Sequence, residues 1–265
     1  MELRTSALQA LCEPDPERKV ELTHGLWARE TSLPIAPEPA LIAPADLPGR
    51  PLRPELVDPK NLPRRSARTP EGRAALIHAI CHIEFNAINL ALDAIWRFAS
   101  MPEAFYRDWL RIAAEEAQHF TLLHTLLQQH LGRRYGDFPA HGGLWAMCEQ
   151  TAGDITARMA LVPRTLEARG LDATPPIQAK LRLAGTPDAL AACDALDIIV
   201  RDEIGHVAVG NRWYGWLCQR QQLDPVAHYR ALLKRYRAPK LKPPFNLAAR
   251  RQAGFSPTEL DELGP

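Results

Sequence analysis

The stretches Glu116-Ala-Gln-His119 and Glu203-Ile-Gly-His206 decide the fold that this sequence predicts. Each places a carboxylate and an imidazole three residues apart in a segment with the apolar pattern of a helix, so both side chains leave the same helix face. A single Glu-x-x-His occurs readily by chance in a helical chain with nine histidines. Two of them, together with single glutamates on two further helices, form the ligand pattern of a carboxylate-bridged two-metal site in a four-helix bundle.

The two single glutamates are Glu84 and Glu167. Glu84 precedes Glu116 by 32 residues and Glu167 precedes Glu203 by 36, enough in each case to follow half a helix, turn and return to the same level. The gap of 51 residues between Glu116 and Glu167 suits a long crossover between the second and third helices. Glu167 lies close to Gly170 and a helix end, so Glu149, earlier on the same predicted face, is the alternative third-helix ligand.

The apolar periodicity predicts four long helices, over residues 69–100, 102–131, 144–168 and 187–220. Glu84 and Glu116 interrupt the apolar faces of the first two helices. A buried carboxylate needs a partner, either a metal ion or a buried arginine. Polar residues on the opposite face of the first helix are expected to meet solvent or the N-terminal arm and are left out of the ligand set: His78, His82, Asn86, Asn89 and Asp93.

Two extensions flank the predicted bundle, which gives three parts: residues 1–68, 69–222 and 223–265. A short helix is expected near residues 5–12, followed by a proline-rich stretch over residues 33–70 that is either a poorly ordered leader or, as we favour, an arm laid over the bundle. Residues 225–258 carry eight lysines and arginines and no acid. This asymmetry indicates either a solvated helix face and tail or a site for an anionic substrate or RNA.

The composition predicts one soluble domain with extensions, because 265 residues with 46% hydrophobic content can bury a substantial core and the net charge is only +1. Five widely spaced cysteines form no Cys-x-x-Cys pair, which argues against a disulfide framework and favours a reducing, cytoplasmic location. Acidic residues in the first thirty positions argue against a signal peptide or a membrane anchor.

The chain resembles the ferritin-like di-metal carboxylate superfamily, and within it the DUF455 family. The resemblance is carried by residues 78–98, 113–123, 166–172 and 202–214. It implies two irons: Glu84 and His119 on one, Glu167 and His206 on the other, with Glu116 and Glu203 as bridges. It also implies that Asp202 orients His119 and that Glu115 orients His206; the alternative for both acids is an ordinary surface contact.

Four carboxylates and two imidazoles favour iron, with manganese as the other choice, over structural zinc. Six protein ligands on two ions leave open coordination positions, so the sequence predicts an O2-dependent oxygenase or oxidase that acts on an unknown small molecule with an electron donor. The resemblance also disfavours a radical-generating reductase subunit. Such proteins carry a tyrosine one turn beyond the histidine, and this chain has Leu123 there. Two alternatives are an iron-storage or ferroxidase protein and an enzyme similar to a tRNA hydroxylase.

Overall fold

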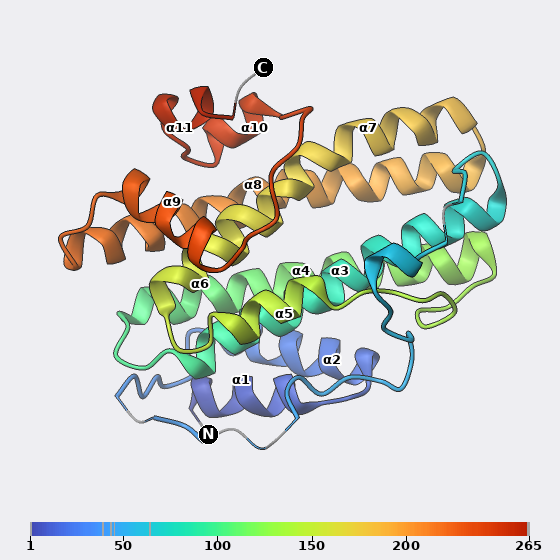
Figure 1. The fold of residues 1–265 in the computed structure, drawn as a ribbon. Helices are drawn as coiled ribbons and strands as arrows, with labels where there is room; N and C mark the ends of the chain where they lie inside the picture. The colour runs from blue at the N-terminus through green and yellow to red at the C-terminus, as the bar shows by residue number, and fades with distance from the viewer. Residues whose placement is uncertain (1, 39, 43, 45, 64, 264–265) are drawn as a thin grey trace. The chain divides into compact units, whose positions relative to one another are not determined.

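The chain is all-α, as the sequence predicts (Figure 1). The computed structural model describes residues 2–38, 40–42, 44, 46–63 and 65–263, and no β-strand occurs among them. The chain divides into two compact units. Unit 1 comprises Met1–Gly142 with Thr186–Ala195, and unit 2 comprises Gly143–Gly185 with Leu196–Pro265. The predicted division into residues 1–68, 69–222 and 223–265 stays a prediction, and so does the ferritin-like bundle.

Two long helices, α3 (Pro70–Arg97) and α4 (Glu103–Leu131), pack along one another at the centre of unit 1. Thr69 caps α3 by accepting a hydrogen bond from the Gly72 amide, and Pro70 occupies the first turn, where its missing N–H is not needed. Gly132, with a φ of 59°, ends α4 in the left-handed conformation that glycine adopts easily. Both helices therefore lie within three residues of the predicted bounds.

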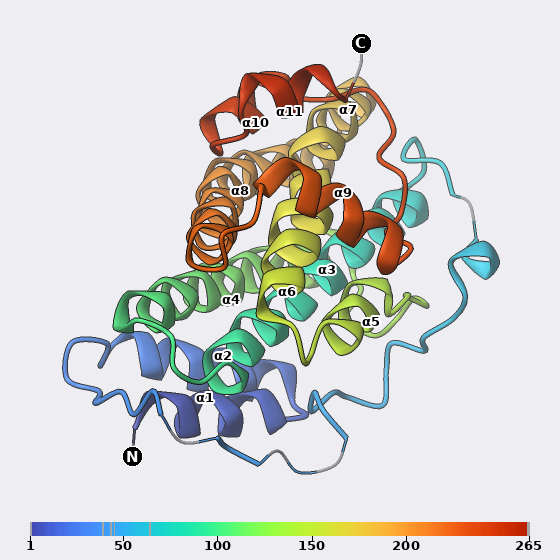
Figure 2. The same cartoon turned by 60° about the vertical axis from the view of Figure 1, so that its left-hand side comes forward.

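An N-terminal hairpin, α1 (Leu3–Cys12) and α2 (Pro16–Trp27), covers these two helices (Figure 2). α1 packs against α3, and α2 packs against α4. Arg4 is fully buried and donates hydrogen bonds to the carbonyls of Ile95 and Trp96, at the end of α3 where helical carbonyls lack partners. The hairpin is thus part of the core of unit 1, and its second helix was not predicted.

The proline-rich segment between α2 and α3 runs over unit 1 as an arm with one 3-10 turn, Pro59–Asn61 (η1). Pro48 and Pro54 are buried, and the Val57 amide donates to the Ala140 carbonyl at 2.9 Å. The described part of the segment therefore agrees with the arm, and not with a poorly ordered leader. The predicted arm also includes Pro39, Ala43, Ala45 and Arg64, which lie outside the described residues.

α3 is the one helix of the described chain that is long and apolar enough to cross a membrane, with a mean hydropathy of 1.4 over its best window. In the structure 72% of that window is buried, which is typical of the core helix of a soluble protein. The helix also carries a series of buried polar residues, from His78 to Asp93, that hydrocarbon would not accommodate without cost.

Unit 2 contains α5 (Gly143–Gln150), α6 (Ile155–Leu161), a π-helical segment η2 (Val162–Glu167), α7 (Ala168–Ala184) and most of α8 (Pro187–Arg220). The predicted single helix over residues 144–168 is wrong. Asp154 starts a new helix by accepting from the Ala157 amide, and Pro163, which has no amide hydrogen, accompanies the π segment.

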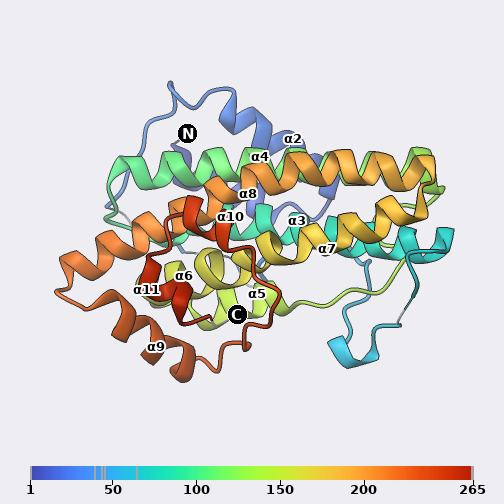
Figure 3. The ribbon, with the colours of Figure 1, turned by 90° about the horizontal axis from the view of Figure 1, so that it is seen from above.

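Three short C-terminal helices complete unit 2: α9 (Pro225–Arg235), α10 (Leu247–Gln252) and α11 (Pro257–Asp261). α10 lies over α8, with α11 beside it (Figure 3). They share one apolar core with α7 and α8, formed by Ala168, Leu171, Val207, Ala249, Ala253, Phe255 and Leu260. The C-terminal extension is therefore a packed part of unit 2.

Candidate metal centre

Unit 1 brings together three of the predicted ligands in its interior. Glu84 comes from α3, and Glu116 and His119 come from neighbouring turns of α4; all three are buried. Their ligand atoms lie within 4.8 Å of one another. The Nδ1 atom of His119 is 3.2 Å from Glu116 Oε2 and 3.5 Å from Glu84 Oε2. This buried group of two carboxylates and one imidazole could hold a metal ion.

Burial and mutual contact shift the pKa values of this group. Burial, and then the neighbouring charge of Glu116, raise the pKa of Glu84 well above its usual value. Burial alone would lower the pKa of His119, but the hydrogen bonds and charges of Glu116 and Glu84 raise it to about 11. Two acids in a dry interior thus require a proton or a cation, and a metal ion satisfies the same requirement.

Unit 2 contains the second Glu-x-x-His, on α8. His206 is fully buried and Glu203 is 8% exposed, and His206 Nδ1 lies 3.7 Å from Glu203 Oε1. In both motifs, then, the Nδ1 atom lies close to the glutamate one turn earlier, at 3.2 Å in the first motif and 3.7 Å in the second. Glu167, the predicted third-helix ligand, is also buried and lies at the last position of η2. The alternative, Glu149, is exposed at the end of α5 and accepts a hydrogen bond from the Trp145 indole at 2.9 Å.

The π segment sets the position of Glu167, because a π turn contains an additional residue that shifts every following side chain around the helix. Thr165 Oγ1 donates to the Ala160 carbonyl, five residues earlier, at 2.7 Å. On α8, Gly210 leaves room for Pro163: a Cβ added at Gly210 would lie 2.6 Å from the proline Cβ. Such π segments occur often at functional sites, and Pro163 is the one feature of the local sequence that points to this segment.

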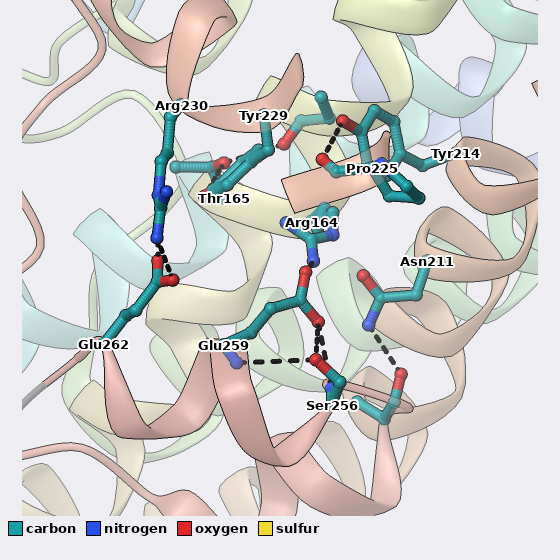
Figure 4. Close-up of polar contacts among 12 residues, drawn as sticks. Arg164, Thr165, Asn211, Tyr214, Pro225, Tyr229, Arg230, Ser256, Glu259 and Glu262 are labelled. Atoms are coloured by element: carbon teal, nitrogen blue, oxygen red, sulfur yellow. Dashed lines mark hydrogen bonds and ion pairs between the residues drawn. The ribbon is translucent and has the colours of Figure 1, made fainter. Parts of the chain in front are cut away.

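Arg164, also in η2, contacts residues of α8, α9 and α11 (Figure 4). Its buried guanidinium pairs with Glu259 of α11 and lies 4.3 Å from the ring centroid of Tyr229 in α9. The aromatic rings of Tyr214 and Phe255 lie on it as well, at 5.1 and 4.8 Å. Glu259 is held in turn by a capping box with Ser256 at the start of α11. The C-terminal helices therefore fix the segment that carries Glu167.

We expect Gly210→Ala to lower the free energy of unfolding by about 1–3 kcal/mol, because the new methyl group would overlap Pro163 in a packed interior. Gly215→Ala on the same helix is the matched control. A Cβ at Gly215 meets nothing within 4 Å, so this change should stabilise the helix by roughly 0.5–1 kcal/mol. Urea unfolding of both variants measures the difference; equal effects would mean that the contact of Gly210 with Pro163 is not tight.

The two predicted orienting acids lie in partly buried positions and contact arginines. Glu115 accepts from Arg111 at 3.0 Å, one turn earlier on α4, and Asp202 accepts from the neighbouring Arg201 at 2.8 Å. Each acid has further interactions besides these. Their action on the imidazoles of His206 and His119 stays a prediction.

The polar residues on the outer face of α3 are buried, so the expectation that they meet solvent is wrong: His78, His82, Asn86, Asn89 and Asp93. His78 accepts a hydrogen bond from the Gly136 amide at 2.8 Å, and His82 contacts the Tyr135 hydroxyl at 2.8 Å. Asp93 is fully buried and binds Arg97. The other expectation, contact with the arm, holds for the residues that face Pro48 and Pro54, namely His82, Asn86 and Asn89.

The basic C-terminal segment is partly neutralised by acids outside it. Arg250 forms a buried ion pair with Asp172, and Arg230 pairs with Glu262. Arg235 lies 3.9 Å from Asp154. These arginines thus serve packing within unit 2.

The fold and this group of residues define an all-α protein with a buried carboxylate and imidazole cluster able to bind metal. The chain belongs to the DUF455 family, described as "Protein of unknown function (DUF455)", whose model matches residues 12–261. It is 48% identical over 265 residues to an "Uncharacterized protein" of Haemophilus influenzae (strain ATCC 51907 / DSM 11121 / KW20 / Rd), covering 95% of this chain and 90% of the relative. No solved structure matches the chain.

Proposed function

We propose that this protein is a two-metal carboxylate protein of the ferritin-like kind that uses iron and O2. The observation that carries the proposal is the buried group of Glu84, Glu116 and His119 in unit 1. We propose, from the repeated Glu-x-x-His pattern of the sequence, that Glu203 is a further ligand and that His206 binds the second ion. The matching orientation of Nδ1 in the two Glu-x-x-His motifs supports equivalent roles for them.

The third-helix ligand in this proposal is Glu167, not Glu149. Burial favours Glu167, since Glu149 is exposed and its carboxylate already accepts from an indole. Glu84 and His119 would then hold one ion, Glu167 and His206 the other, and Glu116 and Glu203 would bridge them. Asp202 and Glu115 would orient the two imidazoles through their remaining ring nitrogens.

The donor set fits iron or manganese. It consists of carboxylate oxygens and imidazole nitrogens, and four carboxylates neutralise two divalent cations. The buried cysteines have no place in it; burial and the charge of Glu84 raise the pKa of Cys81 well above its usual value, which keeps this thiol protonated. When bound, two Fe(II) ions would supply the electrons for the reduction of O2, and the apolar surroundings of the cluster would exclude bulk water.

The reaction would be the oxidation of a small molecule by O2, with an external electron donor, in the cytoplasm. The substrate is not defined by the site. A nucleic-acid substrate has weaker support, because three of the eight basic residues in the C-terminal segment contact acids of unit 2. Iron storage is the other alternative, and it would require a large mineral core in an assembled shell.

Counting iron per chain after loading with Fe(II) tests the proposal. Two irons per chain, unchanged by excess Fe(II) in air, is the result expected for an enzyme. Hundreds of atoms per chain would indicate storage.

A further inference from the structure

The outer face of α3 and the arm enclose a pocket in unit 1 that the metal centre does not use. Three arm prolines form one wall, together with the exposed Arg50. His82, Asn86 and Asn89 of α3 form the other wall, together with Tyr135. No carboxylate lines the pocket. We propose that this pocket binds a small oxyanion, the carboxylate or phosphate group of a ligand.

The orientation of Asn89 provides the first argument. The Lys19 ammonium donates to the Leu11 and Gly49 carbonyls, at 3.1 and 2.8 Å, and to Asn89 Oδ1. An ammonium group can only donate, so the oxygen of Asn89 must face Lys19 and its Nδ2 must face the other way. Asn89 is fully buried, and Nδ2 has no acceptor among the described residues. Leaving such a donor unsatisfied costs about 1–3 kcal/mol, so the pocket calls for an acceptor.

The charges provide the second argument. Arg50 makes no hydrogen bond or ion pair with another described residue, and Lys19 lies fully buried behind Asn89 with neutral acceptors. Burial lowers the pKa of Lys19 to about 7; Cys12 and Glu13 oppose this shift, and Arg50 adds to it. Arg50 and, in its protonated form, Lys19 thus supply positive charge at the pocket, and no carboxylate lines it. An anion there would accept from Asn89 and be attracted to both cations.

The dimensions limit the ligand to a compact group. The cavity volume is about 20 Å³, so one oxyanion group fits. Any larger remainder of a ligand must extend over the exposed side chains of the arm. Proline fixes its own backbone angle, so the arm wall is stiff and presents the pocket already formed. The pocket lies on the face of α3 opposite Glu84, so this inference does not depend on the metal centre.

Calorimetric titration of the full chain with inorganic phosphate, and separately with acetate, tests the proposal at constant ionic strength in chloride. We expect one saturable site for at least one of them, and the one that binds identifies the oxyanion. Arg50→Ala should weaken binding at least about tenfold. Arg53→Ala is the matched control, because this exposed arm arginine does not line the pocket, and it should bind like the wild type.

Asn89→Asp supplies an independent result. Its carboxylate can still accept from Lys19 but places a negative charge in the pocket, so binding should be lost while the protein stays folded by circular dichroism. Arg50 is exposed, and its replacement keeps the test decisive even if Asn89→Asp does not fold. The proposal is overturned if neither anion gives saturable heat, or if Arg53→Ala weakens binding as much as Arg50→Ala does.

Discussion

Glu116→Gln and Glu203→Gln should each abolish assembly of the metal pair, with less than about one tenth of the wild-type metal retained. Each change keeps the volume of the side chain and removes the negative charge that a bridging ligand supplies to both ions. Glu116 is fully buried against His119, so no water-exposed acid can take its place. Metal analysis after loading and desalting measures the loss.

Asp93→Asn is the matched control for these two variants. Asp93 is another fully buried carboxylate of unit 1, but it binds Arg97 and lies on the outer face of α3. His82→Ala is a second control, since its imidazole contacts Tyr135 and Asn86. Both controls should lower stability and keep the metal. If His82→Ala lost metal as completely as Glu203→Gln, the metal would be bound on the outer face of α3 and not on the face of Glu84.

The second prediction concerns O2. The Fe(II)-loaded protein should consume O2 rapidly and become oxidised to Fe(III), whereas Asp202→Asn should slow this reaction at least roughly tenfold with little loss of metal. The reason is that Asp202 is proposed to set the orientation and basicity of His119 without being a ligand. An O2 electrode and stopped-flow absorbance after anaerobic loading provide the rates, and metal analysis of the same samples provides the control.

Two outcomes would count against these statements separately. If the reduced protein is inert towards O2 even with candidate substrates present, the oxygenase proposal fails and a redox-silent metal role is the better account. If Asp202→Asn reacts like the wild type, its orienting role is lost while the ligand set stands. Arg201→Ala removes the ion pair of Asp202 with Arg201, and its O2 reaction rate shows whether that pair affects the reaction.

Local patterns in the sequence were sufficient for the helices that carry unit 1. The start of α3 at Thr69 and Pro70 and the end of α4 at Gly132 agree with the predicted bounds, because capping depends on neighbouring residues. Periodicity likewise predicted that Glu84 and Glu116 face the core, and the structure buries both in one group with His119. These features depend on residues that lie within a few turns of one another.

Features that depend on distant residues could not be predicted in this way. The burial of His78 results from a loop after α4, and the position of Lys19 depends on Asn89, 70 residues later. The π segment before α7 is stabilised by Glu259, 95 residues after Arg164. No periodic pattern records such contacts. For this reason the third helix was predicted to be continuous, and the outer face of α3 was expected to meet solvent or the arm.

Metal content of the wild-type protein tests the central claim most directly. The full chain is loaded anaerobically with excess Fe(II), passed over a desalting column and analysed for iron and protein. The account predicts about two irons per chain, bound tightly enough to survive desalting. Near-zero iron, or one tightly bound zinc that Fe(II) cannot replace, would contradict the two-iron carboxylate site.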